Sequence, residues 1–254
     1  MLFIVTNFEN SMLQDNHFST TQAHDFEVCN FIARVNAKAE LNINVQHSHS
    51  VSRDELESFV LNKFQDCHSA TIREFMPLLV DLGLGLNKRA VVGIRPGIER
   101  PFFLENYLDD PIEVTLRELA GTQVVREGIV EIGNFAADNV RLGSLLFTIL
   151  AKGLLLAGYQ WMVFTATNEV EKMIGKLGCA QTVLTDANAA RVQESSSDWG
   201  SYYDNNPKVI ACNLKDTITK AEGNVRLNQI FSDHSGEIVR LAAALKSVGN
   251  GVFV

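Results

Sequence analysis

Residues 128–178 read GIVEIGNFAADNVRLGSLLFTILAKGLLLAGYQWMVFTATNEVEKMIGKLG. This stretch predicts a strand at 129–137, a helix from Leu142 to about Ala157, an apolar strand at 161–167 and a short helix that begins at Asn168. A strand that is apolar on both faces and stands between two helices indicates a sheet covered by helices on both sides. The sequence therefore predicts an α/β fold, and such folds bind ligands where strands end and helices begin.

The composition limits the class of protein. The chain has 254 residues, 46% of them hydrophobic, which is enough for one large domain with appendages. Its 22 basic and 30 acidic residues give a formal charge of -8, which argues against a nucleic-acid partner bound through its phosphates. The cysteines, at positions 29, 67, 179 and 212, lack the paired spacing of a zinc site or a redox couple. We expect them to be reduced and mostly buried.

No segment has the pattern of a membrane or export signal. The apolar first five residues have no basic region before them and soon meet Asn7 and Glu9, so they make a poor signal peptide. The uncharged window at 153–168 falls short of the ~20 residues that a spanning helix needs. We therefore expect a cytoplasmic protein without stable membrane insertion.

Weaker patterns lie on both sides of residues 128–178, which we call the organising stretch. They predict strands within 2–8 and at 41–45, a helix behind a capping box at Ser52 and Glu55, and a helix at 112–120. A hairpin is predicted from 71–82 and 89–95, a short strand at 102–104 and a final strand at 209–214.

These patterns divide the chain into three parts. Residues 1–40 are a variable N-terminal extension, 41–213 form the main domain, and 214–254 form a helical C-terminal tail. The tail helices have apolar faces with mixed charges, which do not suit a membrane surface. We expect the tail to pack on its own domain or on a second subunit, which would give a homodimer.

Six segments, in this order, carry a resemblance to a known family: REFMP at 73–77, FLENYL at 103–108, DPIE at 110–113, VEIGNFA at 130–136, VFTAT at 163–167 and WGSYYD at 199–204. Together they resemble the bacterial thermostable hemolysins, over about two-thirds of the chain. That family is in turn similar to the acyl-homoserine-lactone synthases and to coenzyme A-dependent N-acetyltransferases.

The resemblance implies an N-acyltransferase-like mixed sheet, covered by helices on both faces and followed by a C-terminal helical tail. In such enzymes the strand that carries Glu131 splays from the strand that carries Thr165, and an acyl thioester binds between them. The donor would be acyl-CoA or an acyl carrier protein, the acceptor a small-molecule amine, and no metal is implied. The residues implied to contact the donor are Phe135, Ala136, Ala137, Arg141, Gly143, Ser144, Thr165 and Asn168.

The resemblance also suggests catalytic groups. A buried Glu131 would have a raised pKa and could act as a general base towards an amine; alternatively it faces solvent or pairs with an arginine. Ile174 stands where related enzymes have a tyrosine that protonates the leaving thiolate, so this proton would come from water, Tyr202 or Tyr203. Arg141, in a loop with shorter spacing than the family pattern, could bind phosphate or simply be a solvated loop residue.

Three functions remain open at this level. The first is acyl transfer, the second is direct membrane damage as the family name suggests, and the third is ligand binding without catalysis. The acidic run formed by Glu105, Asp109, Asp110 and Glu113 could bind a cationic amine, but it more often marks a solvated helix start.

Overall fold

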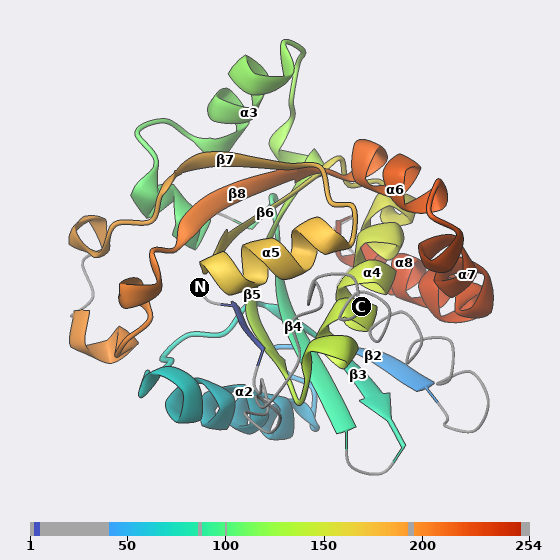
Figure 1. Ribbon diagram of the computed structural model, residues 1–254, viewed down its shortest axis with the longest axis horizontal. Helices are drawn as coiled ribbons and strands as arrows, with labels where there is room; N and C mark the ends of the chain where they lie inside the picture. Colours follow the sequence, from blue (N-terminus) through green and yellow to red (C-terminus); the bar gives the residue numbers. More distant parts are fainter. Residues whose placement is uncertain (1–2, 6–40, 86–87, 100, 193–195, 250–254) are drawn as a thin grey trace, which may run out of the picture.

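The computed structural model describes residues 3–5, 41–85, 88–99, 101–192 and 196–249. Its centre is an eight-stranded mixed sheet with the order β2-β3-β4-β5-β6-β8-β7, in which β1 pairs separately with β5 (Figure 1). The strands are β1 (Phe3–Val5), β2 (Leu41–His47), β3 (Leu78–Leu84), β4 (Lys88–Pro96), β5 (Ile129–Ala137), β6 (Trp161–Ala166), β7 (Gln181–Asp186) and β8 (Lys208–Asn213).

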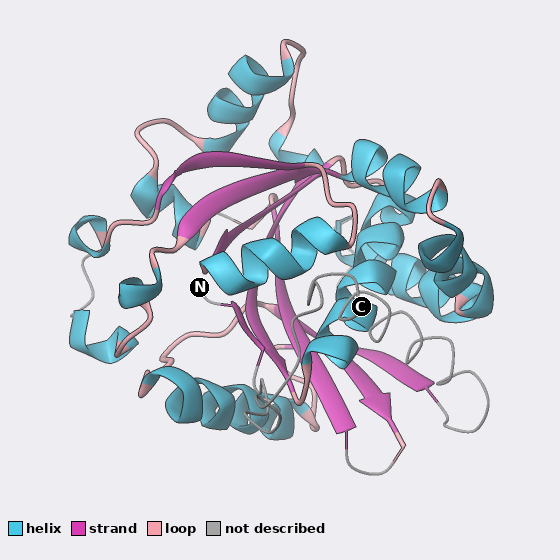
Figure 2. Ribbon diagram, viewed as in Figure 1, coloured by secondary structure: helices cyan, strands magenta, loops and turns pink. Residues whose placement is uncertain are grey.

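Helices surround this sheet, as the secondary-structure colours of Figure 2 show. The α-helices are α2 (Arg53–His68), α3 (Ile112–Ala120), α4 (Val140–Ala157), α5 (Asn168–Lys176), α6 (Leu214–Glu222), α7 (Val225–Asp233) and α8 (Ser235–Gly249). The 3-10 helices are η1 (Phe103–Tyr107), η2 (Arg126–Gly128), η3 (Ala189–Arg191), η4 (Ser196–Trp199) and η5 (Tyr203–Asn205).

Both faces of the sheet are covered, which confirms the predicted α/β class. On one face, α4 and α5 pack with α6, α7 and α8, and their apolar side chains form one buried cluster with Val130 and Ile132 of β5. On the other face, α2 packs near β3 and β4, whereas η1 and α3 pack beside β6 and β8. The organising stretch at 128–178 has the strand-helix-strand-helix order that its periodicity predicts.

The C-terminal helices complete the core of the main domain. Ile238, Leu241 and Leu245 of α8 are buried, and Leu241 lies against Gly153 of α4, where an added Cβ would come within 3.0 Å of it. The tail therefore packs on its own domain, one of the two arrangements expected from its apolar faces. A homodimer through these helices stays a prediction.

Four local predictions were wrong in detail. The segment at 102–104 is not a strand but leads into η1. Ser52 precedes α2 but makes no side-chain cap hydrogen bond, and the first hairpin strand begins at Leu78, after Pro77, rather than at 71. Strand β7 was not predicted, because its residues are mostly half-buried and lack clear alternation.

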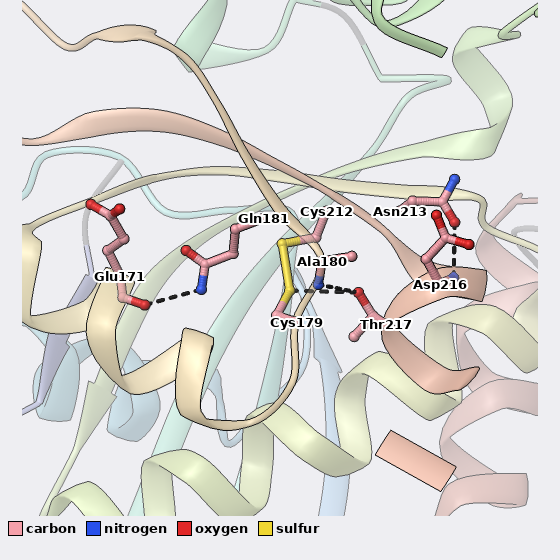
Figure 3. Close-up of a disulfide and its surroundings, with 8 residues drawn as sticks. All are labelled: Glu171, Cys179, Ala180, Gln181, Cys212, Asn213, Asp216 and Thr217. Atoms are coloured by element: carbon pink, nitrogen blue, oxygen red, sulfur yellow. Dashed lines mark hydrogen bonds between the residues drawn. A yellow bond between two sulfur atoms is a disulfide. The ribbon is translucent and has the colours of Figure 1, made fainter. Parts of the chain in front are cut away.

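Two cysteines expected to be reduced are joined in a disulfide. Cys179 and Cys212 are 33 residues apart in sequence, but they meet where β7 pairs with β8 (Figure 3). Cys67 is free and exposed, and Cys29 lies outside the described residues. Disulfides persist mainly in oxidising compartments, so the cytoplasmic location stays a prediction.

Candidate active site

The ladder between β5 and β6 stops partway along the two strands. They pair in parallel from Ile129 with Trp161 to Ile132 with Phe164, although β5 continues to Ala137 and β6 to Ala166. The predicted separation of these strands is thereby confirmed. Glu131, opposite Val163, stands one pair before the separation.

A β-bulge accounts for the separation. The register between β4 and β5 shifts between Val91 and Gly93, and Asn134 on β5 has a left-handed backbone with φ of 45°. Its side-chain Oδ1 accepts a 2.7 Å hydrogen bond from the backbone N–H of Met76. Because a bulge bends its strand, β5 turns away from β6 directly after their last pair.

Glu131 is buried and held by backbone amides. Its side chain accepts hydrogen bonds from the N–H of Phe103 at 3.0 Å and of Leu104 at 2.9 Å, and Arg95 Nη1 lies 3.6 Å from Oε2. Burial raises the pKa of Glu131, although Arg95 and the two amides act in the opposite direction. Of the two predicted alternatives, solvent exposure is wrong, since Glu131 is 1% exposed.

A half-buried carboxylate, Glu105, shapes the segment that holds Glu131. Glu105 accepts from the N–H groups of Phe102 and Ile112 and forms two hydrogen bonds with Arg126, at 2.6 and 2.7 Å. Burial acts to raise the pKa of Glu105, but these hydrogen bonds and the Arg126 charge lower it. Glu113 also bonds Arg126, so these two half-buried carboxylates belong to an ion cluster around the buried Arg126 rather than to a solvated helix start.

Tyrosines reach the separated strands on the face of Glu131. Thr165 lies two residues beyond Val163 on β6, so its side chain shares that face. Tyr202 is 1% exposed, and its hydroxyl donates to the carbonyl oxygen of Thr165 at 3.5 Å. Tyr203 packs edge-on against Tyr202, and its hydroxyl lies 2.6 Å from that of Tyr107.

Tyr202 therefore reaches β6 at Thr165 and Tyr203 reaches η1 at Tyr107, and their catalytic roles stay predictions. Burial and the neighbouring Tyr203 raise the pKa of Tyr202 well above its ordinary value, so its hydroxyl stays protonated at neutral pH. Ile174 is buried in the apolar core around α4. The isoleucine side chain has no proton to donate to a leaving thiolate, as expected from the sequence.

Three buried polar atoms around this site have no hydrogen-bond partner in the described part of the chain: Asn134 Nδ2, Thr165 Oγ1 and Trp199 Nε1. Trp199 packs against Phe103, with ring centroids 5.7 Å apart. Buried polar groups are normally paired, so these atoms mark places where a ligand could supply the partner. No sequence pattern singled out Asn134, because its role depends on the bulge.

The N-terminus of α4 is partly satisfied by its own cap. Asn139 Oδ1 accepts from the N–H of Leu142 at 3.0 Å, and the Asn139 carbonyl accepts from the N–H of Gly143. Gly143 and Ser144 are buried, and a Cβ on Gly143 would come within 3.0 Å of the Phe135 ring. The glycine thus permits close packing of α4 on β5, whereas Arg141 lies half-buried and Asn168 exposed at the two helix starts.

A separate hollow lies away from these residues. It has a volume of about 810 Å³ and is lined by the start of β6 at Trp161, the start of β7 at Gln181 and the end of β8 at Asn213. This is the end of β6 opposite Thr165, and none of the predicted site residues lines it. No cluster of three potential metal ligands occurs among the described residues.

A family model described as thermostable hemolysin matches residues 46–218. No curated protein matches the chain. Among solved structures, the AHL synthase LasI is similar at 14% identity and a TM-score of 0.46, over 70% of this chain and 91% of LasI. FeeM, an N-acyl amino acid synthase from uncultured soil microbes, is also similar at 14% identity and a TM-score of 0.46, over 72% of this chain and 96% of FeeM.

Proposed function

The chain belongs to the thermostable hemolysin family, and we propose that it is an N-acyltransferase, which transfers an acyl group from a thioester to a small-molecule amine. One observation carries this proposal: the β5–β6 ladder ends one pair beyond the buried Glu131. A thioester between the separated strands would reach a carboxylate, a tyrosine hydroxyl and an unpaired threonine hydroxyl. We propose acyl-CoA or an acyl carrier protein as the donor.

In this reaction the amine nitrogen attacks the thioester carbonyl, the C–N bond forms and the C–S bond breaks. Glu131 accepts the proton that the amine loses, because its raised pKa suits a general base. Oε2 accepts the Phe103 amide and faces Arg95, whereas Oε1 accepts the Leu104 amide and keeps a second acceptor position for the substrate. Tyr202, protonated at neutral pH, supplies the proton that the thiolate gains and then regains a proton from solvent, while Glu131 releases the amine proton to solvent.

We propose that any lytic effect is indirect. Acylation of a polar amine yields an amphiphile, which can disturb a bilayer without the enzyme. Only α4, among the described helices, is long and apolar enough to cross a membrane, and 67% of it is buried within the fold. This burial supports a core helix rather than a membrane-inserting one.

The test begins with native mass spectrometry of freshly purified protein, which would reveal a retained acyl carrier or coenzyme A adduct. Purified protein is then incubated with acyl-CoA or an acyl carrier protein thioester and pools of small amines. Free thiol release and a new amide mass are expected together. Glu127→Gln, which neutralises an exposed glutamate in η2, serves as the control for Glu131→Gln. If neither donor releases thiol with any amine pool, the acyl-transfer proposal is rejected.

A further inference from the structure

Strand β1 occupies the space that opens where β6 leaves β5. Along one edge of β5, β4 pairs as far as Ala137. Along the other edge, β6 pairs only to Ile132. The parallel pairing of Phe3, Ile4 and Val5 with Phe135, Ala136 and Ala137 must therefore use the edge that β6 has left.

The surroundings of β1 agree with this position. It contacts α2 on one side and α5 on the other, and α5 begins directly after β6. Figure 1 shows β1, in dark blue, alongside β5 and close to the start of α5. The backbone groups of Phe135, Ala136 and Ala137 on this edge thus have a strand of the same chain as their partner.

A thioester donor would need the same edge. The pantetheine arm of coenzyme A or of an acyl carrier protein is extended and carries two amide groups. An extended amide chain binds an exposed strand edge through main-chain hydrogen bonds. One edge can pair with only one such chain at a time, so β1 and the donor arm exclude each other.

We propose that β1 is an intramolecular plug, which competes with the acyl donor for the edge of β5 at Phe135–Ala137 and leaves when the donor binds. This inference rests on the proposed function, because it assigns the edge to the donor arm. Displacement is feasible because β1 has only three paired residues and each backbone hydrogen bond contributes little net free energy. The plug would keep the site closed until a donor is present.

The test uses full-length protein with two separate substitutions, Ile4→Pro and Val5→Pro. Successive N–H groups of a strand point to opposite edges, and proline has none, so one of the two variants loses a ladder bond to β5. Ile4→Val keeps the N–H and the branched side chain and is the matched control. If the unplugged state is populated to about 10% in the wild type, the plug weakens apparent donor affinity roughly tenfold.

Coenzyme A and an inert thioether analogue of acyl-CoA are the probes, and calorimetry gives their dissociation constants. We expect at least one proline variant to bind about tenfold more tightly than the wild type and Ile4→Val. Unchanged affinity in both proline variants overturns the plug while the acyl-transfer proposal stands. If no protein binds either probe, the plug is rejected, and thiol release from the acyl carrier protein thioester decides the acyl-transfer proposal separately.

Hydrogen exchange of the wild type supplies a measurement that needs no variant. Adding the analogue should speed exchange at residues 3–5 and leave residues 135–137 protected, since the donor arm replaces β1. If residues 3–5 stay protected while the analogue is bound, the plug is rejected even where a proline variant fails to fold.

Discussion

The two faces of the β5–β6 pair differ in their apolar packing, which is continuous on one face and divided on the other. Under α4, the side chains belong to one apolar cluster that runs from β3 to α8. On the opposite face, the apolar side chains form two clusters, one under α2 and one under α3. Phe103 and Tyr203 pack against both, and the buried Glu131 and Thr165 lie on this interrupted face.

This difference indicates a division of roles. A continuous apolar face contributes free energy of folding in proportion to the area it buries. The interrupted face carries polar groups whose burial is costly unless they are paired. Substitutions under α4 should therefore change stability, whereas those on the interrupted face should change activity.

The largest effect is expected for Glu131→Gln. Loss of the general base should lower the rate of acyl transfer by about 10²–10⁴-fold, measured as thiol release at saturating donor. Ile132→Val, one residue along on the opposite face, should lower the free energy of unfolding by about 0.5–1.5 kcal/mol and leave the rate nearly unchanged. Equal rates for Glu131→Gln and the wild type would remove Glu131 from the chemistry.

Asn134→Ala should destabilise the fold by about 2–4 kcal/mol. It places a Cβ-bearing residue without a stabilising side chain in the left-handed region and leaves the buried Met76 N–H unpaired. Asn206, with φ of 46°, is exposed, so Asn206→Ala should show only the backbone part of about 1–2 kcal/mol. Urea unfolding measures the stability of both variants. Equal losses of stability would mean that the hydrogen bond between Asn134 and the Met76 N–H does not stabilise the bulge.

Arg141→Ala should weaken donor binding by about 1–3 kcal/mol if the guanidinium contacts a donor phosphate. Calorimetry with coenzyme A measures the change. Arg240→Ala removes the same charge from the surface of α8, where the side chain pairs with Glu237, and should leave affinity unchanged. Equal affinity in both variants would mean that Arg141 contacts no donor phosphate.

A smaller effect is expected in the pH dependence of stability. The folded protein holds the Glu131 proton to higher pH than the unfolded chain does, because burial raises this pKa above its ordinary value of 4.5. At a pH between the pKa of Glu131 in the unfolded chain and its higher pKa in the folded protein, the folded state binds more protons. The stability that this group contributes therefore falls as pH rises. Subtracting the Glu131→Gln stability curve from that of the wild type should therefore give a difference that decreases above pH 4.5. A flat difference would mean that this pKa is not raised.

No effect at all is expected on protein-free liposomes. To perforate a bilayer, α4 would have to leave the core, at a cost close to the whole stability of a domain, about 5–15 kcal/mol. Purified, lipid-free protein should therefore release no dye, and Glu131→Gln should abolish any lysis of cells. Dye release by both proteins would show direct action on bilayers, and acyl transfer would have to be abandoned as the cause of lysis.

The sequence by itself determined the central elements. The apolar patterns of 129–137, 142–157 and 161–167 predict strand, helix and strand, because hydrophobic periodicity is a local property of the chain. The family resemblance, rather than periodicity, pointed to Glu131 and Thr165, whose roles in a site stay predictions. Gly121, with φ of 64°, ended α3 where the sequence predicted.

Only the tertiary structure decided how distant segments meet. Residues 102–104 form no strand, because Glu131 and Glu105 take the amide hydrogens of Phe102, Phe103 and Leu104. Cys179 and Cys212 pair through the register of β7 with β8. The position of β1 depends on the bulge at Asn134. This bulge frees an edge of β5, more than 100 residues after β1 in the sequence. Such contacts leave no periodic trace in the sequence, because their partners are brought together only when the whole sheet forms.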